Sequence, residues 1–198
     1  MTRPDLIRGV ILAFVVLVAG CGLFSPRDPR PGGGAGVNCL TPNSPNDVVS
    51  NILSNYGSLP GVTCYASMID TSFTFHPDDR DSTDAGTDTV YAHWTRDIEV
   101  RVAGNIAADD TSHLVVFDST YANSVISPGP PRTELRFYAY HINIHAAQSP
   151  DTLYQGRAEI TFTQGSDAQW RVTNWKDQRD TSGFRTWGYL RRIYRVGF

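Results

Sequence analysis

The most suggestive pattern for metal chemistry is a pair of histidines with an asparagine between them. His141, Asn143 and His145 alternate along a run that reads as a β-strand, so their side chains would share one face. Zinc and copper sites use histidines spaced in this way. However, Ile142 and Ile144 supply the apolar face of the same run, and a third and a fourth ligand are not evident. We therefore expect a solvated sheet face here and no metal site.

A second group of possible metal ligands is a set of aspartates in one short segment: Asp78, Asp79, Asp81, Asp84 and Asp88. Calcium favours such oxygen-rich loops. The spacing does not meet the EF-hand pattern, because Thr83 follows the first alternating aspartates and Gly86 is out of place. The sequence predicts a solvated acidic loop over residues 77–89.

Acid–base chemistry would need a carboxylate or a histidine close to a second polar group. Four side chains are candidates for lining a pocket of this kind: Asp70, His76, Tyr138 and Tyr140. Asp70 stands where a predicted strand begins, and His76 stands at its end. The two tyrosines could instead be sheet-surface aromatics whose hydroxyls remain in water.

In the strand that carries the two tyrosines, the apolar face changes sides partway along. Leu135 and Phe137 are apolar on one face, whereas Ile142 and Ile144 are apolar on the other. A β-bulge near Ala139–Tyr140 would reconcile the two halves, and bulges redirect side chains beside functional sites. We therefore predict a bulge at this point.

The elements that must position these residues fall into a simple order. Apolar residues recur with a helical period in the first part of the chain, and with a strand period in the last part. The predicted helices cover 45–56, 62–69 and 94–108, a first strand covers 71–76, four further strands cover 114–121, 134–146, 152–164 and 169–176, and 183–198 is an amphipathic tail. This order favours an α+β domain with helices on one face of an antiparallel sheet.

Three further expectations concern the packing of this domain. The four tryptophans, Trp94, Trp170, Trp175 and Trp187, should build the core between helices and sheet. Small residues at Gly156 and Ala158 on the inner face of one strand predict either close packing or space for a ligand, and we favour close packing because cores fill to high density. In the tail, a small basic face is expected from Arg191, Arg192 and Arg195.

The first 20 residues have the features of an export signal. An apolar run, Gly9–Val18, follows Arg3 and Arg8 and is too short to span a bilayer. The residues that close it, Val18-Ala19-Gly20-Cys21, resemble the lipobox of bacterial lipoproteins, in which the cysteine receives a diacylglyceryl group and becomes the first mature residue. An ordinary signal peptide that contains a cysteine is the alternative.

This resemblance implies a division of the chain and a location. Residues 1–20 would be a signal peptide, 21–40 the lipidated Cys21 with a Pro/Gly-rich tether, and 41–198 the folded domain. The protein would be lipid-anchored in the cell envelope. Gly22 stands where enteric lipoproteins retained in the inner membrane carry an aspartate, which favours the outer membrane. The net charge of −3 argues against nucleic acid as a partner.

The two remaining cysteines, Cys39 and Cys64, form an even pair in an exported chain. An oxidising compartment favours a disulfide between them. Such a bridge would close a loop of about 25 residues and would contribute roughly 3 kcal/mol in the chain-entropy model. Two free buried thiols are the alternative.

Three segments of the domain resemble the NTF2-like superfamily, which includes nuclear transport factor 2, ketosteroid isomerase and SnoaL-like polyketide cyclases. They are Tyr65–Phe75, the hairpin formed by Gly156–Phe162 and Trp170–Asp177, and the ending Thr186–Arg191. The resemblance covers about residues 45–195. It implies a cone-shaped α+β fold, in which a strongly bent antiparallel sheet lies on N-terminal helices.

Enzymes of that superfamily use an Asp or His base and a Tyr or carboxylic acid donor inside the cone, but none of their catalytic motifs maps onto this sequence. The leading expectation is a non-enzymatic binding module without a cofactor, which holds a small apolar ligand in the cone or a protein partner on the sheet. One alternative is an isomerase or cyclase that uses Asp70, His76, Tyr138 or Tyr140. Another is a structural envelope protein that forms a homodimer through the sheet. A close Asp–His or Asp–Tyr pair in the cone would favour the enzyme.

Overall fold

The computed structural model describes residues 37–84, 88–109, 111–120, 124–146 and 152–195. The predicted signal peptide, Cys21 and most of the predicted tether lie outside the described residues. In the part of the chain that is described, no helix combines the length and the apolar character needed to cross a membrane.

Most of the helices come before the main run of strands. They are α2 (Pro45–Asn55), η1 (Leu59–Gly61), α3 (Val62–Met68), α4 (Asp79–Asp84), η2 (Asp88–Val90), α5 (Arg96–Ala108) and α6 (Trp187–Ile193). Helix α2 begins as predicted, because the Ser44 hydroxyl accepts a hydrogen bond from the Asp47 N–H and Pro45 occupies the first turn.

The strands are β1 (Ile69–His76), β2 (Thr111–Thr120), β3 (Val125–Ser127), β4 (Thr133–Ala146), β5 (Thr152–Gln164) and β6 (Trp170–Gln178). They form one sheet in the order β1-β6-β5-β4-β2, and β3 also pairs with β4. These pairs are antiparallel except β1 with β6, which are parallel. A parallel pair requires a long connection, and here the chain from α4 to β5 provides it.

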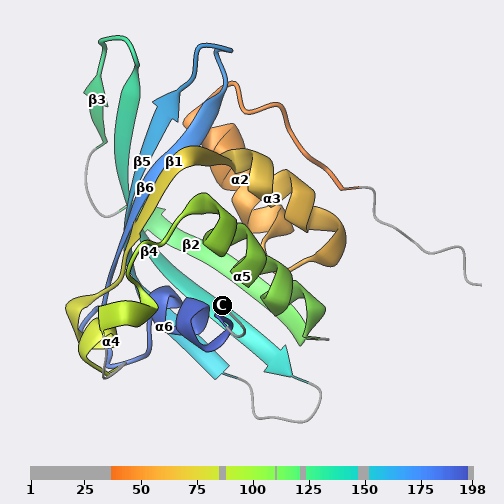
Figure 1. The fold of residues 1–198 in the computed structure, drawn as a ribbon, viewed down its shortest axis with the longest axis vertical. Coiled ribbons are helices and arrows are strands. Elements are labelled where there is room, and N and C mark those ends of the chain that lie inside the picture. Colours follow the sequence, from red (N-terminus) through yellow and green to blue (C-terminus); the bar gives the residue numbers. More distant parts are fainter. Residues whose placement is uncertain (1–36, 85–87, 110, 121–123, 147–151, 196–198) are drawn as a thin grey trace, which may run out of the picture. The chain divides into compact units, whose positions relative to one another are not determined.

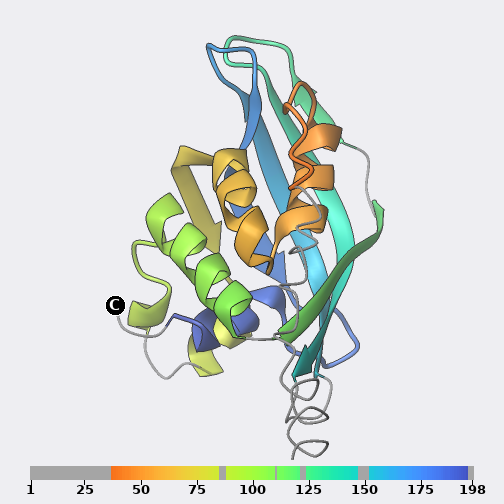
Figure 2. The same ribbon diagram turned by 90° about the vertical axis from the view of Figure 1, so that its right-hand side faces the viewer.

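Helices α2, α3 and α5 cover one face of the curved sheet (Figures 1 and 2). Helix α6 lies between the sheet and α5, at the end of the sheet where α4 is also found (Figure 1). This arrangement confirms the predicted α+β class and the helical layer on one side of a bent sheet. The tail is therefore not an external appendage, because it enters the space between the two layers.

The acidic segment differs from the predicted loop, because Asp79–Asp84 forms the short helix α4. Its first turn carries Asp79 and Asp81, and negative charges stabilise a helix N-terminus. The prediction of a solvated segment is also wrong for one member, since Asp81 is fully buried.

The prediction that the apolar face of β4 changes sides near Ala139–Tyr140 is wrong. Tyr138, Tyr140, Ile142 and Ile144 are all buried on the inner face, so β4 alternates regularly through this region. A bulge is nevertheless present at the predicted place, but in the neighbouring strand: the pairing of β2 with β4 shifts by one residue opposite Ala139–Tyr140. The apolar pattern indicated the irregular position and assigned it to the wrong strand.

The core is built around the four tryptophans, each of which is at most 4% exposed, as predicted. Close packing at Gly156 is also confirmed. A Cβ atom at this position would lie 2.6 Å from the Tyr140 hydroxyl and 2.7 Å from the Gln178 carbonyl oxygen. No larger residue fits there, so the small side chain serves packing and leaves no ligand space at that point.

The N-terminal end of the domain is held to α3 by the predicted disulfide, Cys39–Cys64. The neighbouring residue is held as well. The Asn51 side chain accepts a hydrogen bond from the Leu40 N–H (2.8 Å) and donates one to the Leu40 carbonyl (2.7 Å). The segment that leads into the domain is therefore held by a covalent bond and by two hydrogen bonds between the Asn51 side chain and the Leu40 backbone.

Candidate functional site

Two of the four predicted pocket residues lie outside the space between the bent sheet and its helices, which is called the cone below. Asp70 is half-buried and accepts hydrogen bonds from the N–H (2.9 Å) and the hydroxyl (2.8 Å) of Ser72. His76 is exposed at the end of β1. Phe73 and Phe75 occupy the inner positions of this strand, so alternation directs His76 outward. Both side chains therefore lie away from the buried face of the sheet, and His76 lines a hollow at the surface instead.

Tyr138 does face inward, where it packs as part of the core. Its ring stacks on Phe117 with centroids 4.5 Å apart, and Arg136 Nη1 donates to its hydroxyl over 3.3 Å. Burial raises the pKa of Tyr138, although the Arg136 guanidinium acts in the opposite direction. A tyrosine held in this way is a neutral hydrogen-bonding group that anchors Arg136 at neutral pH.

Tyr140 belongs to a buried hydrogen-bonded group with Asp177. The Tyr140 hydroxyl donates to Asp177 Oδ1 over 2.6 Å and accepts from the Trp187 N–H over 2.8 Å. Asp177 Oδ2 accepts from the Gly188 N–H over 2.5 Å. Burial raises the pKa of the Asp177 carboxyl to about 6, while the Arg191 charge works against this shift.

A second buried group joins α5 to α6. Glu99 accepts hydrogen bonds from the Tyr65 hydroxyl (2.5 Å), from Trp94 Nε1 (2.8 Å) and from Arg191 Nε (3.0 Å). Both Glu99 and Arg191 are fully buried. The carboxylate therefore meets three donors from three different parts of the chain, as a buried charge requires.

Arg191 is enclosed by aromatic rings as well. Its guanidinium carbon lies 4.4 Å from the centroid of Phe75, 4.5 Å from that of Trp175 and 4.9 Å from that of Trp187. The predicted basic face on the tail is therefore wrong for Arg191. Arg192, also in α6, covers the ring of Tyr189 at 4.6 Å, a contact in which the cation lies on an aromatic face.

A third contact fixes the start of α6 to α4. The Thr186 hydroxyl, which caps α6, donates to Asp81 Oδ2. Arg179 Nη2 lies 2.5 Å from the other oxygen of the same carboxylate. Asp81 thus links the segment after β6 to the N-terminus of α6.

The inner carboxylates were missed by sequence reasoning. Glu99 could have been found, because the buried stripe of α5 continues through Val102, Ala103 and Ile106 at helical spacing. Asp177 could not, since its partners come from β4 and from the backbone of α6. Chemically, the Tyr140–Asp177 pair has the reach of an acid–base pair. However, the backbone N–H groups of Trp187 and Gly188 in α6 already donate hydrogen bonds to this pair.

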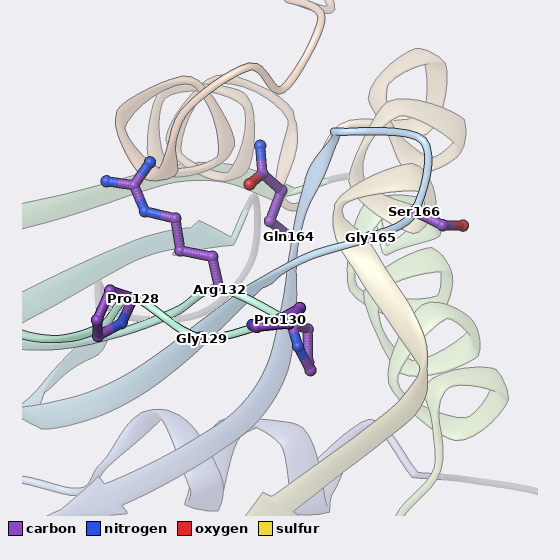
Figure 3. Close-up of a pocket in the computed structure, with 8 residues that line it drawn as sticks. Pro128, Gly129, Pro130, Arg132, Gln164, Gly165 and Ser166 are labelled. Carbon is purple, nitrogen blue, oxygen red and sulfur yellow. The ribbon is translucent and has the colours of Figure 1, made fainter.

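Two hollows, each of about 510 Å³, lie at the surface of the domain. The first lies between the turn that precedes β4 and the β5–β6 turn and is lined by Pro128–Arg132 and Gln164–Ser166. In Figure 3 the side chains of Arg132 and Gln164 extend to the same side, and Ser166 points away from them. Proline and glycine form most of its wall, and the Arg132 guanidinium lies over the Trp170 ring at 5.6 Å.

The second hollow is polar. Its lining consists of His76, Pro77, Asp79, Ser82, Asn174 and Lys176. These residues come from β1, α4 and β6 and the turn between β1 and α4, on the outer side of the sheet. The hollow therefore has no part in the buried groups that surround Tyr140 and Glu99.

Of the two histidines considered for metal binding, only His141 has a described side chain. His141 Nδ1 lies 2.8 Å from Asp118 Oδ1, and the side chain of His145 lies outside the described residues. Across 37–195, excluding the undescribed gaps, no cluster of three or more His, Cys, Asp or Glu side chains has a geometry suited to a metal ion.

The sequence matches no protein-family model and no curated protein. Among solved structures it is similar to an NTF2-like superfamily protein from Salmonella enterica, with a TM-score of 0.49 and 11% identity over 69% of this chain and 89% of that one. It is also similar to a protein described as a scytalone dehydratase from Novosphingobium aromaticivorans, with a TM-score of 0.48 and 11% identity over 72% and 90% of the two chains.

A third similar structure is ActVI-ORFA from Streptomyces coelicolor, with a TM-score of 0.46 and 14% identity over 67% of this chain and 94% of that one. At these identities a likeness concerns architecture alone, and function has to be argued from the site. A bent sheet that carries its helices on one face, with most helices preceding the long strands, makes this an α+β domain.

Proposed function

We propose that this chain is a lipid-anchored protein of the bacterial envelope whose domain binds its partner on an outer surface and performs no catalysis in the cone. The observation that carries the second part is the position of α6. Trp187, Leu190 and Arg191 are fully buried between the sheet and the helices. The space that a ligand or a substrate would occupy is thus filled by the chain itself.

The polar groups inside the cone support the same proposal. An acid–base site needs a group that can exchange a proton with a bound substrate. Here Tyr140 and Asp177 bond to each other and to the Trp187 and Gly188 N–H groups. Their hydrogen-bonding capacity serves to dock α6. The expected small apolar ligand in the cone is replaced by recognition outside it.

The acid–base alternative is favoured by one specific observation, the short contact between Tyr140 and Asp177. For this pair to act on a substrate, α6 would have to leave the cone. The hydrogen bonds to its first turn and the burial of Arg191 would then be lost together. We therefore place this alternative second.

The expected homodimer through the sheet remains a prediction. Its contact would use the outer face, where Leu135 and Phe137 are half-buried and the paired Val125 is exposed. The neighbouring strands β5 and β6 present threonines on that face, Thr161, Thr163 and Thr173. The sheet thus offers a small apolar patch beside a polar surface.

A cavity experiment tests the filled cone. The wild-type protein should not bind indole, whereas Trp187→Gly should leave an apolar cavity that indole refills, with a gain in melting temperature. Phe184→Gly is a matched control, because Phe184 is exposed just before α6 and its removal opens no cavity. Saturable binding of indole to the wild-type protein, with a shift in tryptophan fluorescence, would show that the cone is open.

The anchor is tested separately at Cys21. In a bacterium that processes lipoproteins, the wild-type protein should enter the detergent phase on phase separation and Cys21→Ala should not, because the acyl chains are attached through this thiol. Ser25→Ala in the predicted tether is the control and should behave as the wild type. Detergent partitioning that persists in Cys21→Ala would contradict lipid anchoring at this residue.

A further inference from the structure

The polar hollow at the end of the β1–β6 pair is organised by the register of these two strands. Thr74 pairs with Asn174, and His76 pairs with Lys176. Residues in register on adjacent strands direct their side chains to the same face of a sheet. The hydrogen bond from Asn174 Nδ2 to Thr74 Oγ1 (2.8 Å) fits this arrangement and holds the Asn174 amide, which is part of the lining of the hollow.

Two groups in this hollow are available for a ligand. Lys176 is the only lysine of the chain, whose other cationic side chains are arginines. Among the described residues, neither Lys176 nor His76 has a hydrogen bond or an ion pair through its side chain. By contrast Arg171, on the same strand, is bound to Asp167 over 2.5 Å. A cation and an imidazole therefore lie side by side without a partner in the described part of the chain.

Carboxylates lie close to these groups but leave them unpaired. Asp79 lines the hollow from α4, and Glu159 lies opposite Lys176 in the register of β5 with β6. Glu159 Oε1 accepts a hydrogen bond from Gln178 Nε2 over 2.7 Å, which draws it toward its other neighbour. The hollow thus combines positive donors on the strand side with a carboxylate and the Ser82 hydroxyl on the helix side.

We propose that this hollow binds a small hydroxylated carboxylate of the uronic-acid type. The ligand carboxylate would contact Lys176 and His76, and its hydroxyl groups would bond to Asp79, Ser82 and Asn174. The proposal deepens the proposed function, on which it rests only in placing recognition outside the cone. Charged donors recognise a carboxylate through short, strong hydrogen bonds, and the Asp79 carboxylate accepts from hydroxyl groups.

The balance of charges selects this ligand class over two others. A phosphate would bring about two negative charges at neutral pH against one lysine, with Asp79 and Glu159 nearby. A neutral sugar would use the hydroxyl partners but would leave the ammonium group of Lys176 without a counter-charge. A ligand with a single carboxylate and several hydroxyl groups meets both sides of the hollow.

The unique lysine permits a direct test on the full-length protein. An amine-selective reagent modifies Lys176, and mass spectrometry of its peptide gives the rate with and without a probe. Glucuronate should protect Lys176 saturably, whereas glucose and inorganic phosphate at equal concentration should not.

Lys176→Gln and His76→Gln should each weaken glucuronate binding by about tenfold, measured by calorimetry. Arg80→Gln, an exposed change on α4 outside the lining, is the matched control and should leave affinity unchanged.

Three results would overturn the proposal: no protection by glucuronate up to about 10 mM, equal protection by phosphate or glucose, or unchanged affinity in both Lys176→Gln and His76→Gln. The test is separate from that of the filled cone. A ligand that entered the cone would change tryptophan fluorescence and leave the modification rate of Lys176 unaltered, so the two proposals fail in different ways.

Discussion

At the scale of single residues, the domain depends on four ionisable side chains that are fully buried: Asp81, Glu99, Asp177 and Arg191. Each acidic group accepts hydrogen bonds from at least two partners. A buried charge with its partners in place is tolerated, whereas one that has lost its partner is strongly destabilising. These residues therefore specify how α6 docks more than they add net stability.

The Glu99–Arg191 pair gives the largest predicted effect of a single change. Glu99→Gln and Arg191→Met should each lower the free energy of unfolding by about 3–5 kcal/mol, because each leaves the other group buried and unpaired. The double change Glu99→Leu with Arg191→Met should recover part of this loss. Urea denaturation measures all three, and a loss below about 1 kcal/mol in both single variants would show that the two side chains do not form a buried ion pair.

Asp177 predicts a specific pH dependence. Its pKa is about 6 in the folded protein, above its ordinary value of 3.8. The folded state therefore holds a proton that the unfolded state releases, so this contribution to stability is fully present below pH 3.8 and is lost as the pH rises through about 6. The shift corresponds to about 3 kcal/mol.

The measurement compares the free energy of unfolding of wild type and Asp177→Asn across this pH range. The wild type should lose stability relative to the variant as the pH rises from about 4 to about 7, because asparagine does not titrate. Parallel curves for the two proteins would contradict the raised pKa. Asp167→Asn is a control whose wild-type carboxyl has a pKa held low, at about 2, by Arg171.

The sequence left two positions open for Tyr140, lining a pocket or lying on the sheet surface with its hydroxyl in water, and it could not show that Tyr140 binds Asp177. The apolar pattern of β4 predicted a switch of face at this point, and it carries no information about β6 and α6, which supply the partners of Tyr140. The outward position of His76 follows from alternation with Phe73 and Phe75, which can be read from the sequence. Local pattern predicts the side of a sheet, whereas contacts between distant segments arise only from topology.

At the scale of elements, α6 occupies space between the sheet and the helices. It has only seven residues, and a helix of this length has little stability of its own. Its position depends on burial of Trp187 and Leu190 and on capping by Thr186. The sequence predicted an amphipathic tail, but not that its buried face would carry Arg191 together with Trp187 and Leu190.

Two substitutions on the same helix test this role. Leu190→Ala should lower the free energy of unfolding by about 2–5 kcal/mol, because Leu190 is fully buried. Ile193→Ala, near the end of α6 and 43% exposed, should change it by less than about 1 kcal/mol. Chemical denaturation measures both, and equal effects would mean that α6 does not dock through the face that carries Leu190.

The N-terminal segment before α2 is the second element with a defined task. The Cys39–Cys64 disulfide closes a separation of 25 residues, and its removal in Cys39→Ser with Cys64→Ser should cost roughly 3 kcal/mol. In the native protein both thiols should resist alkylation until a reductant is added. Ready labelling of the untreated protein would contradict the bridge, and a melting temperature unchanged by reduction would contradict its role in stability.

At the scale of the whole domain, the class and the layers could be predicted because they depend on periodicity, and periodicity is local. The long strands β4, β5 and β6 appeared within a few residues of their predicted bounds. The sequence did not predict three other features: the parallel pairing of β1 with β6, the bulge in β2 and the three-residue strand β3. Each of these depends on a partner in another part of the sequence. The filled interior belongs to the same category, because it requires the end of the chain to meet its middle.

Amide hydrogen exchange of α6 is the measurement that tests most directly whether the interior is permanently filled. If the helix is a fixed part of the core, the backbone amides of Tyr189 and Leu190 should exchange only through global unfolding, with the same opening free energy as the central strand β5. Exchange of these amides at a much lower opening free energy, while β5 remains protected, would reveal a helix that leaves the cone and would contradict a permanently filled interior.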